Sequence, residues 1–206
     1  ENPASVHIPD PPKEFYEPSK ATKDVIAKEL KHSAHNYAPM PVIFAKGKAC
    51  EVWDVDGRRY LDFLSGYSAV NQGHCHPRLL AVASQQLQNL TLSSRAFHND
   101  QFSKFCEYIT GLLGYDKFLP MNTGVEASET AVKLCRRWGY AKKGIPADKA
   151  KVVMCSENFW GRSLAACSSS SDPTCYTNFG PFMPGFQLID FNNLDQLEEA
   201  LSDPNC

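Results

Sequence analysis

The stretch of residues 119–131 constrains the fold more than any other part of the sequence. It begins with the apolar end of a short strand, which Pro120 would stop, and continues into a helix. Thr123 and Glu126 have the spacing of a capping box, in which two side chains bond backbone N–H groups at a helix start. We therefore predict a strand–turn–helix unit whose helix runs to Tyr140. The apolar residues at helical spacing, which we expect to form the buried face of this helix, are Ala127, Ala131, Leu134, Cys135 and Trp138.

Gly124 follows the predicted cap, and two interpretations of it are open. Because glycine has no Cβ, it would make a close turn of the backbone and let an anion approach the free N–H groups of the first helical turn. Those groups and the helix dipole would together bind a phosphate. The other interpretation is an ordinary capped helix, since Thr-Gly-Val-Glu is a much weaker signal than a complete phosphate-binding fingerprint.

From Pro77 onward the sequence alternates between helical and strand patterns. A first helix begins at Pro77 and a second covers residues 100–113, while residues 151–155 and 186–191 form apolar strands and residues 193–202 a last helix. This alternation predicts an α/β fold with a mainly parallel sheet. The residues expected on the buried face of the first of these helices are Leu79, Leu80, Ala83, Leu87 and Leu90. Those expected on the inner face of the last helix are Leu194, Leu197 and Leu201.

Two loops follow strands of this predicted sheet, and ligands of such sheets bind at the carboxyl ends of strands. One loop carries Thr123 and Gly124, and the other carries Phe159, Trp160 and Arg162. An anion-binding helix start beside an aromatic pair and an arginine is compatible with a flat, phosphorylated cofactor. Alternatively, the two aromatic side chains pack in the core and the arginine forms a surface ion pair. The serine run at residues 168–171 is expected to be a plain loop.

Residues 1–76 are predicted to form a separate N-terminal part. Residues 1–18 contain five prolines and read as an extended arm, and Ser19 can cap a short helix that ends near Leu30. Residues 42–45, 50–55 and 59–64 then indicate a small antiparallel meander, with turns at Gly47 and at Asp56-Gly57. Residues 77–206 would be the first part of a larger α/β domain, because a sheet of this kind needs more strands to close its core.

The loop at residues 65–77 is rich in small and polar residues, and such loops often carry function. His74 and His76 within it raise the question of a metal ion. No further ligand is spaced to complete a site, so we predict no metal.

Composition narrows the remaining classes of protein. The net charge is 21 − 23 = −2, which gives no indication of a nucleic-acid or membrane surface, and no apolar run of about 18 residues predicts a membrane helix. The N-terminus lacks a signal-peptide core and an Arg-rich transit segment. The eight cysteines are scattered without a CxxC motif, which favours a reducing compartment. We expect a cytoplasmic protein, with the mitochondrial matrix after removal of a presequence as the alternative.

Six sequence blocks, in order, resemble the N-terminal half of the ornithine δ-aminotransferase family, which consists of pyridoxal-phosphate enzymes of fold type I. The blocks are HNY at 35–37, WDVDG at 53–57, SAVNQGH at 68–74, MNTGVE at 121–126, NFWGR at 158–162 and FGPFMPG at 179–185. The resemblance covers about residues 32–206. It implies that residues 77–206 begin the large domain that binds pyridoxal 5'-phosphate.

The resemblance also implies roles for residues in two of these blocks. Thr123 and the backbone N–H groups of Gly124 and Val125 would hold the cofactor phosphate. Phe159 would stack on the pyridine ring, and Trp160 would help to wall the pocket.

The implied substrates are L-ornithine and 2-oxoglutarate, and the implied reaction moves the δ-amino group from the first to the second, giving glutamate 5-semialdehyde and glutamate. Arg162 would grip the ornithine carboxylate through its planar fork. Tyr37 and Tyr67 would line the substrate site and select ornithine. The active site would form at a homodimer interface. Alternatives are an acetylornithine or 4-aminobutyrate aminotransferase, or a non-catalytic fragment.

No catalytic residue is assigned within this chain. None of its lysines lies in the lysine motif of the family, so the Schiff-base lysine would lie beyond Cys206, in the remaining C-terminal half. We expect the 206-residue chain alone to be inactive.

Two cysteines near the predicted site suggest a redox role. Cys155 lies at a strand end and Cys167 follows in the same region, so a thiolate there could respond to oxidants. The alternative is that both are inert, buried thiols.

Overall fold

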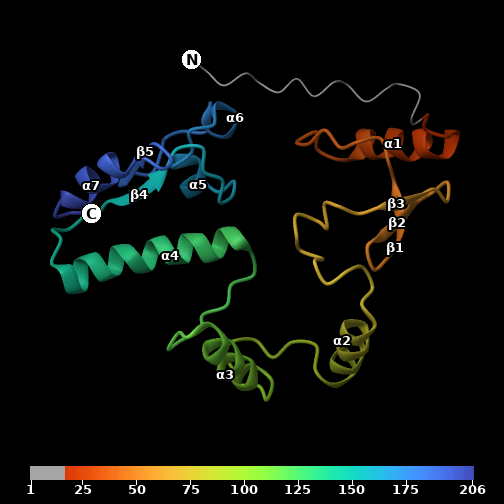
Figure 1. Ribbon diagram of the computed structural model, residues 1–206, viewed down its shortest axis with the longest axis horizontal. Helices are drawn as coiled ribbons and strands as arrows, with labels where there is room; N and C mark the ends of the chain where they lie inside the picture. The colour runs from red at the N-terminus through yellow and green to blue at the C-terminus, as the bar shows by residue number, and fades with distance from the viewer. Residues whose placement is uncertain (1–16) are drawn as a thin grey trace. The chain divides into compact units, whose positions relative to one another are not determined.

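A computed structural model describes residues 17–206, so residues 1–16 of the predicted N-terminal arm lie outside the described residues. The chain divides into two compact units, the first ending at Asn99 and the second running from Asp100 to Cys206 (Figure 1). Among the described residues no helix is both long and apolar enough to cross a membrane.

The first unit contains a three-stranded antiparallel sheet between two helices in the chain order. Its elements are α1 (Lys20–His32), β1 (Phe44–Lys48), β2 (Glu51–Asp54), β3 (Arg59–Leu61) and α2 (Pro77–Asn89). The sheet order is β1-β2-β3, as predicted for a meander. The Asp56-Gly57 turn is confirmed, with Gly57 at φ +80° and its N–H bonded to the Asp54 carbonyl. Gly47 was wrongly predicted as a turn, because β1 continues through it and the chain reverses at Ala49.

Helix α1 is tied to the β2–β3 turn by one carboxylate. Ser19 caps the helix as predicted, accepting a hydrogen bond from the Thr22 N–H. Asp56 accepts hydrogen bonds from the Ser19 hydroxyl at 2.6 Å and from the Thr22 hydroxyl at 3.1 Å. Thr22 is fully buried, whereas Asp56 is exposed, so this contact lies at the edge of the packed part of the unit.

Helix α2 corrects one expectation. It begins at Pro77 as predicted, but it has no buried residue, and Leu79, Leu80 and Leu87 are each more than half exposed. The apolar spacing is present, yet no described element covers this face.

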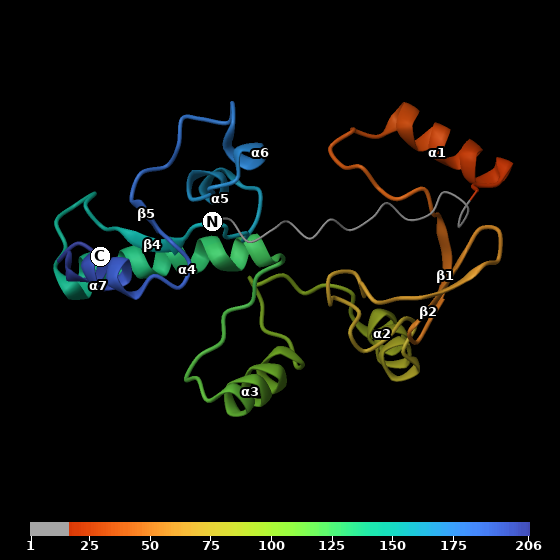
Figure 2. The same ribbon diagram turned by 45° about the horizontal axis from the view of Figure 1, so that its top comes forward.

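The second unit contains a parallel pair of strands with helices around it. Its elements are α3 (Phe102–Leu113), α4 (Gly124–Trp138), a π-helical turn η1 (Gly139–Lys143), β4 (Val152–Cys155), α5 (Leu164–Ser168), α6 (Pro173–Tyr176), β5 (Phe186–Ile189) and α7 (Leu194–Ser202). Strands β4 and β5 pair in parallel, from Val152 opposite Phe186 to Cys155 opposite Ile189. Helix α4 contacts β4 and α5, and α7 contacts β5 (Figures 1 and 2).

The strand predicted before α4 is not formed. Residues 117–121 are irregular, and Leu119 is 59% exposed. A strand requires a partner for its backbone groups, and no described segment pairs with this one.

The buried face of α4 also differs from the prediction. The residues that pack inward are Val132 and, at the start of η1, Gly139, which lies against Ile145 and Ala150. Leu134 and Trp138 are 54% and 60% exposed. The two described strands cover only one side of the helix, and the predicted stripe lies on another side. On α7 the prediction is likewise corrected: Ala200 is buried, whereas the exposed or half-buried residues are Leu194, Leu197 and Leu201.

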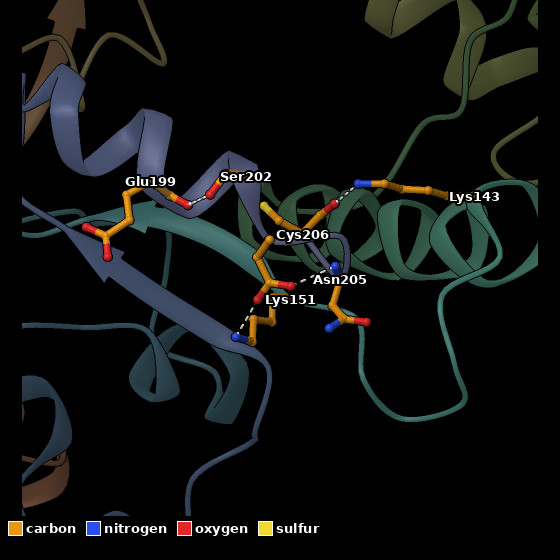
Figure 3. Close-up of polar contacts among 7 residues, drawn as sticks. Lys143, Lys151, Glu199, Ser202, Asn205 and Cys206 are labelled. Carbon is orange, nitrogen blue, oxygen red and sulfur yellow. Dashed lines mark hydrogen bonds and ion pairs between the residues drawn. The ribbon is translucent and has the colours of Figure 1, made fainter.

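Hydrogen bonds hold the segment after α7 beside the start of β4. The Lys151 ammonium donates to Asp203 Oδ2 at 2.6 Å, and the Lys151 N–H donates to the Asn205 carbonyl at 2.8 Å. Lys143, at the end of η1, donates to the Cys206 carbonyl (Figure 3). The hydrogen bond from Lys151 is the main cause that lowers the pKa of the Asp203 carboxyl below its ordinary value.

Candidate functional site

The two loops that the sequence singled out meet at the N-terminus of α4. Gly161 has φ +143°, and a Cβ added to it would come within 2.3 Å of Val125 Cγ2 and 2.7 Å of Val125 Cβ. The backbone of the 158–162 loop therefore lies directly on the first turn of α4. This contact requires glycine twice, once for the backbone angle and once for the close approach.

The capping box at the start of α4 is confirmed. Thr123 Oγ1 accepts from the Glu126 N–H at 3.2 Å, and Glu126 Oε2 accepts from the N–H groups of Asn122 and Thr123 at 2.9 and 3.0 Å. The N–H groups of Gly124 and Val125 form no hydrogen bond with any described residue. Two backbone donors at the positive end of a 15-residue helix fit a phosphate group.

Gly124 differs in one respect from the expectation of a close turn. It belongs to α4, and an added Cβ would meet no atom within 4 Å. The fold itself therefore does not require glycine here. What the missing Cβ provides is open space outside the two free N–H groups.

Phe159 and Arg162 stand together on the exposed side of the loop. The Phe159 side chain is 69% exposed, and the Arg162 guanidinium carbon lies 5.8 Å from its ring centroid. Such a cation–π contact favours a shared orientation of the two groups. Arg162 forms no ion pair with a described residue, although, after the hydrogen bonds from Thr174, its charge also contributes to the lowered pKa of the Asp172 carboxyl. Its planar fork suits an anion.

Trp160 points the other way, into the packed part of the unit. Its indole N–H donates to Ser169 Oγ at 2.8 Å, and its ring lies 6.3 Å from that of Phe186 on β5. The predicted role of Trp160 as a pocket wall stays a prediction. The observed contacts anchor the loop that carries Phe159 and Arg162.

Two residues that support this loop were missed by the sequence reasoning. Ser169 lies in the serine run predicted as a plain loop, yet it is fully buried and receives the Trp160 hydrogen bond. Asn158 donates to the carbonyls of Cys155 and Ser169 at 2.6 and 2.8 Å, which ties the loop to the end of β4 and to the end of α5. The available signal for Asn158 was a polar residue directly after an apolar strand, whereas nothing in the serine run distinguishes Ser169.

Tyr37 and Tyr67 lie in the first unit, and the structure brings them together. Their hydroxyl oxygens are 3.0 Å apart, and both side chains are largely exposed. The hydrogen bond with Tyr37 raises the pKa of the Tyr67 phenol above its ordinary value.

The predicted redox pair has ordinary surroundings. Cys155 and Cys167 are both half-buried free thiols, and Cys167 Sγ lies 3.8 Å from the Arg162 carbonyl oxygen. A regulatory role for either thiol stays a prediction.

Comparison with known proteins identifies the family. Residues 32–204 match the family Aminotransferase class-III. This chain is therefore a member of the class-III aminotransferase family. Its parallel α/β unit carries the junction described above, in which the capped start of α4 meets the loop with Phe159 and Arg162.

Individual relatives carry more specific names. The chain is 58% identical over 181 residues to a mitochondrial ornithine aminotransferase of Rattus norvegicus, and the match covers 88% of this chain and 41% of the rat protein. A solved ornithine aminotransferase of Toxoplasma gondii is 50% identical, with a TM-score of 0.88, and the match covers 89% of this chain and 43% of that protein's chain. It is described as having partial occupancy of PLP at its active site. A solved acetylornithine aminotransferase of Elizabethkingia anophelis is 48% identical with a TM-score of 0.77, covering 91% and 45%. The chain thus spans less than half the length of these relatives and has the fold type I architecture in part.

Proposed function

We propose that this chain is the N-terminal part of an ornithine aminotransferase, which moves the δ-amino group of L-ornithine to 2-oxoglutarate. The observation that carries the proposal is the meeting of the 158–162 loop with the free N–H groups at the start of α4, through Gly161 and Val125. The family match and the rat relative support it.

The residues at this junction suit pyridoxal 5'-phosphate. The N–H groups of Gly124 and Val125 would hold its phosphate, with Thr123 fixing the helix start, and Phe159 would lie on its ring. When bound, pyridoxal phosphate supplies an electron sink for the substrate carbon that loses a proton. Trp160 would not contact the cofactor but would hold the loop that carries Phe159 in place through its hydrogen bond to Ser169.

Substrate recognition is assigned to three exposed polar side chains, Tyr37, Tyr67 and Arg162. Arg162 would pair with the ornithine α-carboxylate and so direct the other end of the substrate toward the cofactor. The phenol groups of Tyr37 and Tyr67 would line the site and favour ornithine. A homodimer with an active site at its interface completes the proposal.

A neighbouring substrate is the second candidate, because the Elizabethkingia anophelis relative is named for acetylornithine and is nearly as similar. A panel of ornithine, acetylornithine and 4-aminobutyrate, each at matched concentrations, separates the two. The name of the rat relative favours the mitochondrial alternative over a cytoplasmic location.

The experiment that tests the function combines activity with mass analysis of the whole enzyme. We expect ornithine-dependent formation of glutamate, and borohydride reduction should fix the cofactor to a lysine outside residues 1–206. The separate 206-residue chain should remain unlabelled and inactive. A cofactor label on any lysine of this chain, or turnover of ornithine by this chain alone, would refute the assignment.

Gly124→Ala tests the phosphate site directly. The added Cβ meets no atom of the fold and glycine is the weaker helix former, so thermal stability without cofactor should be unchanged or slightly higher. The same Cβ would occupy the space outside the free N–H groups, so we expect roughly ten-fold weaker cofactor binding, equivalent to about 1.4 kcal/mol. Absorbance titration with pyridoxal phosphate measures the affinity. Unchanged affinity would mean that the phosphate lies elsewhere.

A further inference from the structure

The loop that carries Tyr67 has an unfavourable backbone. Ser65, Tyr67 and Ser68 have φ values of 51°, 55° and 69°, a region that residues with a Cβ rarely adopt. Such residues persist only where surrounding contacts hold them in place. Hydrogen bonds inside the loop, such as that from the Val70 N–H to the Ser65 carbonyl at 3.0 Å, hold part of this backbone, and contacts at the two ends of the loop hold the rest.

The Asp62 carboxylate binds groups at both ends of the loop that carries Tyr67. Asp62, just before the loop, accepts hydrogen bonds from the N–H groups of Leu64 and Ser65 at 3.0 and 2.8 Å. Its second oxygen, Oδ2, lies 2.7 Å from Nε2 of His74, which lies at the far end of the loop. Hydrogen bonds from the Ser65 N–H and from His74 lower the pKa of the Asp62 carboxyl below its ordinary value, so it accepts as a carboxylate at neutral pH.

His74 is in turn fixed to the sheet. Its N–H and carbonyl pair with the carbonyl and N–H of Ala49 at 2.8 and 2.9 Å. Its side chain lies directly against β1, since a Cβ added to Gly47 would be 2.7 Å from His74 Cγ. The closed loop is thus attached to the β1–β2 turn at one residue.

From these contacts we infer that His74, acting through Asp62, is the positioning residue that places the Tyr67 phenol opposite that of Tyr37 and thereby sets the fit of ornithine. The inference about ornithine rests on the proposed function, whereas the inference about the tyrosine pair rests on the contacts alone. It assigns to His74 a structural task in the substrate site, where the sequence had raised only a metal ligand.

The test compares His74→Ala with His74→Gln in the whole enzyme. Glutamine retains an N–H donor near the position of Nε2, whereas alanine removes it. The control is His32→Ala, because His32 is exposed in the last turn of α1. Each variant carries 3-fluorotyrosine at position 67, whose fluorine signal and titration report the hydrogen bond to Tyr37.

We expect His74→Ala to move the fluorine signal and to lower the phenol pKa, and to raise the KM for ornithine about ten-fold with kcat changed less than about three-fold. His74→Gln should restore most of the fluorine signal and of the KM for ornithine, and His32→Ala should alter neither quantity. An unchanged fluorine signal in His74→Ala overturns the inference, while the proposed function survives if Tyr67→Phe still alters the KM for ornithine. A third outcome is a shifted fluorine signal in His74→Ala, with the KM for ornithine unchanged in both His74→Ala and Tyr67→Phe. This outcome would support the positioning role of His74 and refute the proposed substrate role of the tyrosines.

Discussion

Gly161→Ala is expected to be the most damaging single substitution at the candidate site. At φ +143° a residue with a Cβ is strained by about 1–3 kcal/mol, and the Cβ would lie 2.3 Å from Val125 Cγ2. Overpacking of this kind typically costs about 1–3 kcal/mol more. Relief requires the 158–162 loop to move away from the start of α4. We therefore expect both lower thermal stability and cofactor binding weakened by roughly ten- to hundred-fold.

Two further variants separate the causes. Gly111→Ala is the matched control, because Gly111 lies in α3 with no atom within 4 Å of an added Cβ, and this change should stabilise by about 0.5–1 kcal/mol. Adding Val125→Ala to Gly161→Ala removes the clash with Cγ2 but leaves the contact with Val125 Cβ at 2.7 Å, so it should recover only a part of the loss that the contact causes. If Gly161→Ala binds cofactor like the unaltered enzyme, the loop and the helix start do not form one site.

Arg162→Ala is expected to have the second largest effect, on substrate rather than on cofactor. A hydrogen bond to a charged group contributes about 1.5–3 kcal/mol, so loss of the guanidinium should lower kcat/KM for ornithine roughly ten- to hundred-fold. Arg162→Lys keeps the charge but loses the planar fork, so its kcat/KM for ornithine should lie between those of Arg162→Ala and the unaltered enzyme. Cofactor affinity should change little, because Phe159 and the α4 donors remain.

Steady-state kinetics with both substrates measures this effect. Arg137→Ala provides the control, since Arg137 is an exposed cation in the last turn of α4 and has no role in the site. An Arg162→Ala enzyme with unaltered KM and kcat for ornithine would remove this residue from substrate binding.

Local signals in the sequence were sufficient to predict helix starts and turns. The Thr123–Glu126 capping box, the Asp56-Gly57 turn and the Pro77 helix start each depend on residues within a few positions, and all three are confirmed. The parallel pairing of β4 and β5 followed from the alternation of helices and strands.

The contacts that assemble the site were not predictable in this way. Gly161 meets Val125 across 36 positions, and Ser169 receives Trp160 from inside a run of four serines, so neither contact leaves a periodic trace. The same limit explains the error for Leu134 and Trp138 on α4, because spacing shows that a helix has an apolar face without showing which neighbour covers it.

The parallel pair β4–β5 has a practical consequence for work with this chain. Each of these strands has a single partner among the residues that the structure describes, so its outer edge presents unpaired backbone groups. Exposed edges with uncharged, mainly apolar sequences such as Val152–Cys155 and Phe186–Ile189 recruit further extended chains and begin aggregation. Precipitation of the separately produced chain would therefore report on its unprotected strand edges, and it would carry no information on the cofactor site.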